Sequence, residues 1–303
     1  TCALPISLGD ANGDSMVSIE NLIGSAFNDT LTGDGAANVI DGGAGNDAID
    51  GGAGNDTITY ATAVSAVTVN IGNLGVNVTG GAGSDSITNF ENIIGSAFND
   101  SLTGDGNNNV MEGGAGADVL VGGLGNDTAS YASSNAAVSV SLVPAAANTG
   151  GHAQGDSLSG FENLTGSAFN DVLTGDGFVN ILDGGTGDDL LIGGAGADQL
   201  IGGLGTDTAS YATTSTAVTA NLTNGNGTAG DANGDTYSGI ENLTGGSGAD
   251  SLTGDASANI LVGGAGNDSM SGLDGNDTLD GGQGIDFMQI KRIAQMQTRN
   301  GAT

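Results

Sequence analysis

The sequence predicts an all-β protein: a parallel β-roll or β-helix solenoid of nine-residue turns with longer strand inserts. The first observation is a repeating unit, Gly-Gly-x-Gly-x-Asp-x-U-x, in which U is a large apolar residue. The second is composition, because 59 glycines among 303 residues, with 7 Phe, 4 Tyr and no Trp, argue against a thick globular core. The period of nine and the 2 prolines also argue against a collagen-like chain.

The nine-residue unit occurs 22 times, and its fixed positions have distinct expected roles. Asp holds the sixth position in 18 units, and the other four have Asn there with Asp at the second position. The eighth position is Ile, Leu, Met or Tyr in 20 units and Ala in the other two. This pattern predicts a six-residue turn followed by a short strand with one inward side chain, so that two units complete one coil of the solenoid. The units start at residues 9, 24, 33, 42, 51, 80, 95, 104, 113, 122, 151, 166, 175, 184, 193, 202, 230, 245, 254, 263, 272 and 281.

A longer period overlies the nine-residue one. A Glu-Asn pair recurs at Glu20, Glu91, Glu162 and Glu241, with two equal intervals followed by a slightly longer one. We expect a structural role for these glutamates because they occur at matching places, and hydrogen bonds to backbone for the asparagines beside them. The intervals predict four repeat modules and a non-repeating tail: 1–59, 60–130, 131–210, 211–289 and 290–303.

Three inserts separate the runs of regular units, and they begin at Tyr60, Tyr131 and Tyr211. These tyrosines are expected to be packing residues. Each insert contains an alternating apolar stretch, which predicts a strand with one buried face, at 67–71, 138–142 and 218–222. Because the interval between the first Glu-Asn pairs is close to the length of four coils, the solenoid is predicted to run through the inserts; a flexible hinge at each insert is the alternative.

The charge pattern calls for a cation from outside the chain. No Lys or Arg precedes Lys291, whereas 35 acidic residues do, and the net charge is −32. Like charges at this density oppose compact folding. Nucleic acid and anionic membranes are not expected as partners, since both favour basic surfaces. No apolar run is long enough for a membrane span.

Calcium is the cation that these turns suit best. Glycine permits positive φ and close approach of backbones, and calcium takes six to eight hard oxygen ligands. One loop cannot supply them all, so we expect carboxylates one coil apart to act in pairs: Asp29 with Asp47, Asp100 with Asp118, Asp171 with Asp189, Asp189 with Asp207, Asp250 with Asp268, and Asp268 with Asp286. The predicted ligand residues are Asp29, Gly43, Gly45, Asp47, Gly52, Gly54, Asp56, Asp85, Asp100, Gly114, Gly116, Asp118, Gly123, Gly125, Asp127, Asp171, Gly185, Gly187, Asp189, Gly194, Gly196, Asp198, Gly203, Gly205, Asp207, Asp250, Gly264, Gly266, Asp268, Asp277 and Asp286.

The runs at 42–59, 113–130, 184–210 and 263–289 resemble the RTX family, the hemolysin-type calcium-binding repeats of bacterial secreted proteins. The resemblance implies a right-handed parallel β-roll with multiple calcium ions in its turns, export by type I secretion machinery, and folding on meeting extracellular calcium. Some units depart from the family pattern. The units at 24, 95 and 166 lack the second and fourth glycines, and the Asn-bearing units lack the main carboxylate, so weak or absent binding is expected there.

Other candidate sites carry less weight. His152 is the only histidine and is expected on an exposed loop, so no Ser-His-Asp or Cys-His constellation can form and no catalytic residue is predicted. The runs Asp10–Asp14 and Asp231–Asp235 begin like EF-hand loops but lack the later ligands, and are expected to be variant turns. Cys2 excludes an internal disulfide, because it is the only cysteine.

The sequence thus predicts a non-enzymatic, secreted or cell-surface calcium-binding segment of a larger bacterial protein, with a structural or adhesive role and contact with a cell surface or polysaccharide. One alternative is an accessory folding or secretion module of an RTX enzyme or toxin whose catalytic domain lies outside these residues. Another is that the solenoid is itself an enzyme. We expect the chain to be part of something longer, because it does not begin with Met and its first residues do not form a signal peptide. The tail is expected to start another domain or to reflect where the segment ends.

Overall fold

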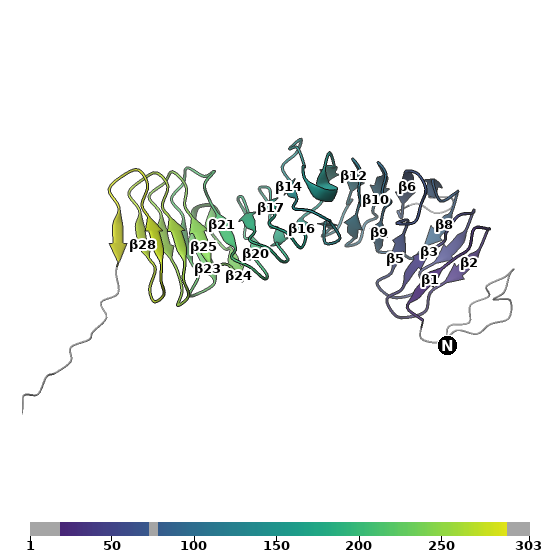
Figure 1. Cartoon of the computed structure of the whole chain (residues 1–303), viewed down its shortest axis with the longest axis horizontal. Coiled ribbons are helices and arrows are strands. Elements are labelled where there is room, and N and C mark those ends of the chain that lie inside the picture. Colours follow the sequence, from purple (N-terminus) through teal and green to yellow (C-terminus); the bar gives the residue numbers. More distant parts are fainter. Residues whose placement is uncertain (1–18, 73–77, 290–303) are drawn as a thin grey trace, which may run out of the picture.

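The computed structural model describes residues 19–72 and 78–289, which form one elongated β-solenoid (Figure 1). Short strands stack side by side along its long axis and are joined by loops at both edges. The unit predicted at 9–17, which includes Asp10–Asp14, lies outside the described residues, as do Cys2 and the tail 290–303. The predicted all-β solenoid is confirmed.

Outside the inserts, successive strands alternate between two faces of the solenoid, because each nine-residue unit makes half of a coil. The first face is a single sheet of 15 strands. In spatial order these are β1 (Asn21–Ile23), β3 (Val39–Asp41), β5 (Thr57–Thr59), β9 (Asn92–Ile94), β11 (Val110–Glu112), β13 (Thr128–Ser130), β16 (Asn163–Thr165), β18 (Ile181–Asp183), β20 (Gln199–Ile201), β24 (Thr236–Ser238), β23 (Asn226–Ala229), β22 (Thr219–Asn221), β26 (Ser251–Thr253), β28 (Ser269–Ser271) and β30 (Phe287–Gln289).

The second face consists of three sheets, of 3, 5 and 7 strands. The first has β2 (Thr30–Thr32), β4 (Ala48–Asp50) and β8 (Ser86–Thr88). The second has β7 (Val78–Gly80), β6 (Val67–Asn70), β10 (Ser101–Thr103), β12 (Val119–Val121) and β15 (Ser157–Ser159). The third has β14 (Ser139–Ser141), β17 (Val172–Thr174), β19 (Leu190–Ile192), β21 (Thr208–Ser210), β25 (Asn242–Thr244), β27 (Ile260–Val262) and β29 (Thr278–Asp280).

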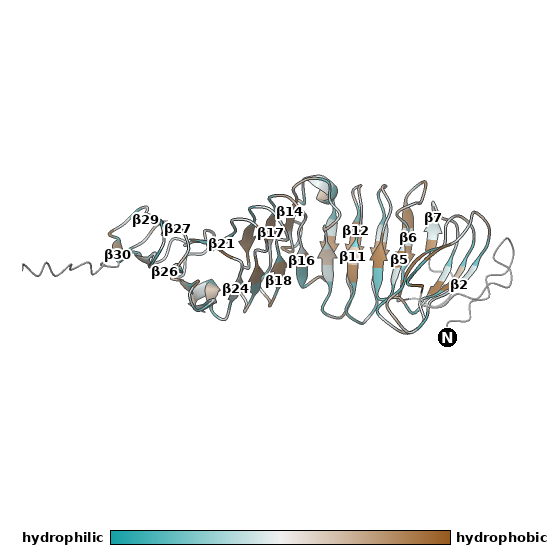
Figure 2. Ribbon diagram, turned by 60° about the horizontal axis from the view of Figure 1, so that its bottom comes forward, coloured by the Kyte–Doolittle hydropathy of each residue, from teal (hydrophilic) through white to brown (hydrophobic). Residues whose placement is uncertain are grey.

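The core is a row of apolar side chains, one from each regular strand. Leu31 pairs in parallel with Ile49 of the next coil, and each is 2% exposed. These residues occupy the eighth position of their units, whose neighbours on the strand point outward because side chains alternate. In Figure 2 the brown, hydrophobic segments lie mainly on the strands, beside teal and pale ones. The predicted two-unit coil is confirmed, and so is burial of the eighth position except in the last described unit, where Met288 is 46% exposed.

The solenoid continues through the inserts. Ile58 of β5 pairs with Ile93 of β9 across the first insert, so the first face is unbroken there. The insert strand β6 pairs in parallel with β10 and antiparallel with β7. Val67 and Val69 of β6 are buried, as the alternating pattern predicted. The antiparallel return strands β7 and β23 are a feature that the sequence pattern did not predict.

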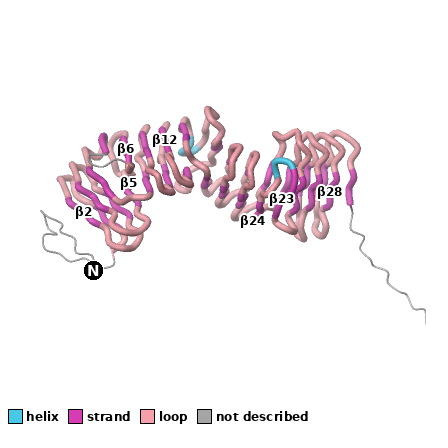
Figure 3. Tube along the Cα trace, turned by 180° about the vertical axis from the view of Figure 1, so that it is seen from behind, coloured by secondary structure: helices cyan, strands magenta, loops and turns pink. Residues whose placement is uncertain are grey.

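Two 3₁₀ turns, Gly151–Ala153 and Gly230–Ala232, lie in the second and third inserts (Figure 3). The second turn includes the start of the Asp231–Asp235 run, so this run is a variant turn of the solenoid, as predicted. Neither turn, nor any other helix in residues 19–72 and 78–289, has the length and hydropathy of a membrane-spanning segment.

The third insert lies on the opposite face from the first two. Strands β6 and β14 belong to the second face, whereas β22 and β23 belong to the first. The interval from Glu162 to Glu241 is longer than the two before it, mainly because the module contains an additional unit, 202–210. Since one unit makes half a coil, the additional unit moves the next insert to the other side of the solenoid.

Candidate metal-binding loops

Stacked loops are joined through their sixth-position residues. The backbone N–H of Asp29 donates to Oδ1 of Asp47 over 2.9 Å, one coil further along the chain. This bond joins all six pairs that the sequence predicted: Asp29 with Asp47, Asp100 with Asp118, Asp171 with Asp189, Asp189 with Asp207, Asp250 with Asp268, and Asp268 with Asp286. The paired aspartates therefore stack one coil apart through an amide and a carboxylate, and their shared role as calcium ligands stays a prediction.

The Glu-Asn pairs complete this stacking where the nine-residue spacing is interrupted. Oε2 of Glu91 accepts the N–H of Asp56 over 2.8 Å, and Glu162 and Glu241 bond the corresponding turns in the same way. Oδ1 of Asn92 accepts the backbone N–H of Val110, one coil further along the chain, over 3.0 Å. The structural role predicted for these glutamates and asparagines is thus borne out at the second, third and fourth pairs.

Within the described residues, ten units share a conformation that we call the open loop, with positive φ at the second and fourth positions. In the unit from residue 113, φ is +90° at Gly114 and +143° at Gly116. A Cβ on Gly114 would lie 2.0 Å from the carbonyl oxygen of Ser96 in the stacked loop. Glycine is therefore needed here for the dihedral angle and for the close approach. The open loops start at residues 42, 51, 113, 122, 184, 193, 202, 263, 272 and 281.

In eight of the ten open loops, one carboxylate oxygen is buried without a hydrogen-bond partner, the exceptions being the loops of Asp277 and Asp286. Asp118 is 1% exposed, and its Oδ1 accepts the N–H of Asp100 over 2.7 Å, but its Oδ2 accepts no hydrogen bond. A buried carboxylate oxygen without a donor is costly, so it requires a proton or a cation. The same unpartnered Oδ2 is found in Asp47, Asp56, Asp127, Asp189, Asp198, Asp207 and Asp268 of the open loops, and in Asp85 of the first insert.

Burial shifts the titration of these carboxylates. Burial raises the pKa of Asp118 to about 7, although the N–H of Asp100 lowers it, and the charge of Asp156 raises it further. Burial also raises the pKa of Asp189 and of Asp198 to about 6. The folded chain therefore disfavours the charged form of these groups unless a cation is near.

Eight other units have what we call a closed loop, in which groups of the same loop already occupy the sixth-position side chain. In the unit from residue 95, Ser96 Oγ donates to Oδ1 of Asp100 over 2.8 Å, and the Ser96 N–H donates to Oδ2. The Ser96 hydroxyl also accepts the N–H of Phe98 over 3.2 Å. Positive φ is absent from the second and fourth positions of these loops, which start at residues 24, 33, 95, 104, 166, 175, 245 and 254.

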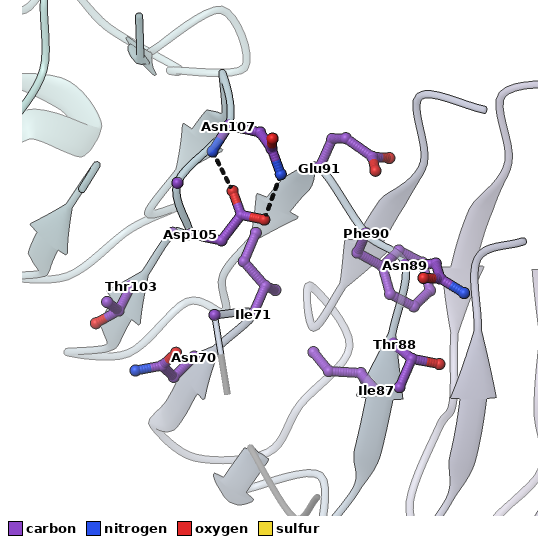
Figure 4. Close-up of a pocket in the computed structure, with 13 residues that line it drawn as sticks. Asn70, Ile71, Ile87, Thr88, Asn89, Phe90, Glu91, Thr103, Asp105 and Asn107 are labelled. Atoms are coloured by element: carbon purple, nitrogen blue, oxygen red, sulfur yellow. Dashed lines mark hydrogen bonds between the residues drawn. The ribbon is translucent and has the colours of Figure 1, made fainter. Parts of the chain in front are cut away.

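Closed loops with Asn at the sixth position use their second-position Asp in a similar way. Asp105 accepts the backbone N–H and the side-chain amide of Asn107, each over 2.8 Å (Figure 4). The N–H of Asp105 in turn donates to Oδ1 of Asn109 over 2.9 Å. The side chain of Glu91 lines the same hollow but points away from this pair (Figure 4). The Asp105 carboxylate is thus hydrogen-bonded within its own loop.

One loop has the sequence of an open loop and the conformation of a closed one. Residues 245–250 read Gly-Gly-Ser-Gly-Ala-Asp, yet the N–H of Gly246 donates to Oδ2 of Asp250 over 2.7 Å. This loop stacks on the third insert, and a Cβ on Gly246 would lie 2.4 Å from the carbonyl oxygen of Thr214. The closed conformation of this loop thus occurs together with a contact to the third insert. The sequence of the loop itself does not reveal that contact.

The predicted ligands divide between the two kinds of loop. All the predicted glycines lie in open loops, as do Asp47, Asp56, Asp118, Asp127, Asp189, Asp198, Asp207, Asp268, Asp277 and Asp286. Asp29, Asp100, Asp171 and Asp250 lie in closed loops, and Asp85 lies in the first insert. Across residues 19–72 and 78–289, His, Cys, Asp and Glu side chains nowhere gather in groups of three or more suited to a metal. A cation in an open loop would therefore need carbonyl oxygens beside the free carboxylate oxygen, a donor set that fits calcium.

The insert tyrosines pack in the core, as predicted, and two also bond a buried carboxylate. The hydroxyl of Tyr131 donates to Oδ2 of Asp156 over 3.0 Å, and that of Tyr211 to Oδ2 of Asp235 over 2.6 Å. The hydroxyl of Tyr60 is buried without a partner. The only sequence signal for the two bonds is that Tyr131 and Tyr211 each begin an insert whose own nine-residue unit carries Asp at the sixth position.

The prediction that His152 lies on an exposed loop is wrong. His152 is half-buried in the first 3₁₀ turn, and its backbone N–H donates to Oγ of Ser134 over 3.0 Å. This bond holds the turn against the start of the same insert. Burial lowers the pKa of the imidazole.

These stacked glycine-aspartate loops are those of a metal-binding β-solenoid. The family model of the RTX calcium-binding nonapeptide repeat matches residues 23–58, 94–129, 156–177, 174–209, 235–270 and 253–288. The matches cover more than half of the chain and leave out most of the three inserts. The chain therefore belongs to the RTX calcium-binding nonapeptide repeat family, and the resemblance seen in the sequence is confirmed. The comparison with curated proteins gives no match.

Proposed function

We propose that this calcium-binding repeat segment folds on binding extracellular calcium and acts as a structural or adhesive part of a larger bacterial surface or secreted protein. The observation that carries the proposal is the set of buried, unpartnered carboxylate oxygens in the open loops. Residues 1–290 contain no Lys or Arg that could neutralise them.

Calcium binding and folding are coupled because the free energy of calcium binding offsets the cost of burying the carboxylates and ordering the chain. Without a cation, burying these carboxylates costs free energy, and ordering the 59 glycines costs more conformational entropy than ordering other residues. In the folded solenoid the open loops present the free carboxylate oxygens together with nearby carbonyls. Calcium that binds only this form shifts the equilibrium toward it by mass action.

The proposed location follows from the same coupling. A loosely folded chain in a calcium-poor cytosol is suited to export, which for this family implies type I secretion machinery. Millimolar calcium outside the cell then stabilises the coil. The rigid solenoid would serve as a spacer or a contact surface toward a cell surface or polysaccharide, and no catalytic role is assigned to it.

Circular dichroism in chelator and in calcium tests the proposal. We expect a largely unfolded spectrum in chelator and a strand-rich spectrum after calcium is added, with magnesium at the same concentration as the control. A strand-rich spectrum that persists in excess chelator at neutral pH would refute the coupling.

A further inference from the structure

We propose that one edge of the solenoid carries three equivalent contact sites for a neutral polysaccharide. Each site consists of an exposed phenylalanine ring and the side-chain amide of the asparagine that follows it. This inference rests on the function proposed above, in which the solenoid serves as a contact surface, and it assigns that contact to particular residues. The three sites are Phe27 with Asn28, Phe98 with Asn99, and Phe169 with Asn170.

The phenylalanines are exposed at one repeated position. Phe27 is 79% exposed, and Phe98 and Phe169 are each 43% exposed. All three hold the fourth position of the unit that follows a Glu-Asn pair, within the sequence Ser-Ala-Phe-Asn-Asp. A single apolar side chain on a protein surface needs no explanation, whereas rings repeated at one position form an extended apolar contact surface.

The three rings lie on the same edge of the solenoid. Their loops lead from the first face to the second, joining β1 to β2, β9 to β10 and β16 to β17. The first face has the order β1-β3-β5-β9-β11-β13-β16, so consecutive rings lie three coils apart. With strands about 4.8 Å apart, this spacing is roughly 14 Å. A long repetitive ligand can contact several such rings at once, which strengthens binding through multivalency.

The backbone of each phenylalanine is fixed before any ligand binds. The hydroxyl of Ser96 accepts the N–H of Phe98 over 3.2 Å and donates to the carboxylate of Asp100 over 2.8 Å. The hydroxyls of Ser25 and Ser167 make the same two bonds in their loops. A preorganised loop lowers the cost of ordering that binding would otherwise carry.

The next coil leaves the rings uncovered at the stacked position. A Cβ on Gly116, which stacks on Phe98, would lie 2.7 Å from the carbonyl oxygen of Phe98. A Cβ on Gly187 would likewise lie 2.6 Å from the carbonyl oxygen of Phe169. Glycine is therefore required at these positions, and the stacked unit contributes no side chain there that could cover the ring.

The asparagine amides are oriented by the same stacking. Oδ1 of Asn99 accepts the backbone N–H of Ala117 over 3.0 Å, and Asn28 and Asn170 accept the corresponding N–H groups over 2.9 and 3.0 Å. All three asparagines are exposed, and within residues 19–72 and 78–289 their Nδ2 groups donate no hydrogen bond. Each site thus presents an amide with two free donors beside an aromatic ring.

This combination suits an uncharged sugar polymer. A sugar ring can stack its apolar C–H face on an aromatic ring while its hydroxyls accept from the amide. A polyanion is disfavoured, because the chain has a net charge of −32 and no basic residue before Lys291. A second copy of the chain would bring an equal negative charge into contact, which favours the neutral polymer over self-association.

Native gel electrophoresis in calcium, with hydroxyethyl cellulose or galactomannan in the gel, tests the inference. We expect at least one of these neutral polymers to retard the wild-type chain. The triple variant Phe27→Ala, Phe98→Ala, Phe169→Ala should bind it at least about tenfold more weakly, because three linked contacts are lost. A wild-type chain that neither polymer retards would overturn the inference.

Phe178→Ala is the matched control for loss of an exposed ring. Phe178 is 75% exposed, but its loop joins β17 to β18 on the other edge, and Val179 follows it in place of asparagine. We expect this variant to be retarded like the wild-type chain. Weakening equal to that of the triple variant would show general apolar adsorption and overturn the inference.

A second pair of variants tests the amides. Asn99→Asp keeps the oxygen that accepts the N–H of Ala117 and removes the two donors. Asn108→Asp makes the same change on the other edge, where Oδ1 of Asn108 accepts the N–H of Asn126 over 2.9 Å. Relative to polymer-free gels, we expect weaker retardation of Asn99→Asp alone, and equal retardation of both variants would contradict a role for the amide.

Circular dichroism and size-exclusion chromatography in calcium separate the remaining outcomes. Each variant should keep the wild-type strand signal. A wild-type chain that gains no strand signal on adding calcium would overturn the proposed calcium-dependent folding. A chain that folds in calcium but forms dimers that the triple variant disperses, without retardation by either polymer, would overturn only the polysaccharide site and assign this edge to a second copy.

Discussion

Glycine has different tasks at different places in the repeat. Gly116 has φ of +143°, and a Cβ there would lie 2.7 Å from the carbonyl oxygen of Phe98 in the stacked loop. Gly106, in the neighbouring closed loop, has no atom within 4 Å of a Cβ position and no positive φ. The first glycine is required by the fold, and the second is not.

Replacing these two glycines by alanine should therefore have opposite effects. We expect Gly116→Ala to destabilise the calcium-loaded chain by about 1–3 kcal/mol, because it forces a strained dihedral against a backbone oxygen. Gly106→Ala should stabilise it by up to about 1 kcal/mol, because it restricts the unfolded chain. Urea unfolding midpoints in saturating calcium measure both, and equal shifts in the two variants would contradict the assignment of open and closed loops.

At the residue scale, the sequence predicted which glycines and aspartates form the loops, because each occupies a fixed position in a repeated unit. It did not predict the state of every loop. The Ser and Asp side chains at second positions give a readable reason for closure, as in Ser96 and Asp105. The closed state of the loop of Gly246 could not be predicted from its own residues, because it occurs together with a contact to an insert that is distant in sequence.

Each regular strand contributes one side chain to the core, so a strand has one position that matters for stability and two that matter little. In β12, Leu120 is fully buried, whereas Val119 beside it is 46% exposed. Leu120 pairs with Leu102 of β10 and with Leu158 of β15 along the second face. Its removal would leave a cavity between three coils.

Two truncations on this strand test the burial pattern. We expect Leu120→Ala to cost about 2–5 kcal/mol, the range for leaving a cavity in place of a large apolar side chain. Val119→Ala should change stability by less than about 0.5 kcal/mol, as is usual for surface positions. Chemical denaturation in calcium provides the comparison; similar losses for both variants would show that the core does not lie where the eighth position places it.

At the element scale, the strands of the repeat were predictable because one apolar residue in nine fixes both the strand and its inward side. The insert strands 67–71, 138–142 and 218–222 were predictable from alternation. The return strands β7 and β23 were not, because Val78–Gly80 and Asn226–Ala229 lack alternating apolar residues. Backbone pairing with the preceding insert strand, instead of side-chain burial, defines them.

Across the whole molecule, the raised carboxyl pKa values link folding to pH. In the folded chain, burial raises the pKa of Asp118 to about 7 and that of Asp85, Asp156, Asp189 and Asp198 to about 6, from an ordinary value of 3.8. The folded form thus holds protons that the unfolded form has lost. Its stability therefore rises as pH falls through this range and declines as pH rises through the folded-state pKa values.

The calcium-free chain should therefore fold more readily in mild acid. We expect its strand signal in circular dichroism to be greater at pH 5 than at pH 8 in the presence of chelator, because protons then replace the missing cations. The calcium-loaded chain, whose carboxylates are already compensated, is the control and should show no such gain. A calcium-free strand signal that is unchanged or weaker at pH 5 would contradict the linkage.

The arrangement of the inserts was only partly predictable at this scale. The sequence shows the longer interval between Glu162 and Glu241 and predicts that the solenoid runs through the inserts, which the continuous first face bears out. The sequence did not predict that the third insert lies on the opposite face from the first two. The placement follows once each unit is known to make half a coil. One additional unit, 202–210, then moves the third insert to the other face.

We propose that divalent cations compensate the buried open-loop carboxylates and thereby stabilise the whole solenoid. Anomalous diffraction from crystals grown in saturating calcium tests this most directly, because it locates each ion. We predict calcium peaks beside the free Oδ2 of residues such as Asp118 and Asp189, and none beside Asp100 or Asp171. Open loops without calcium in such crystals would contradict the compensation.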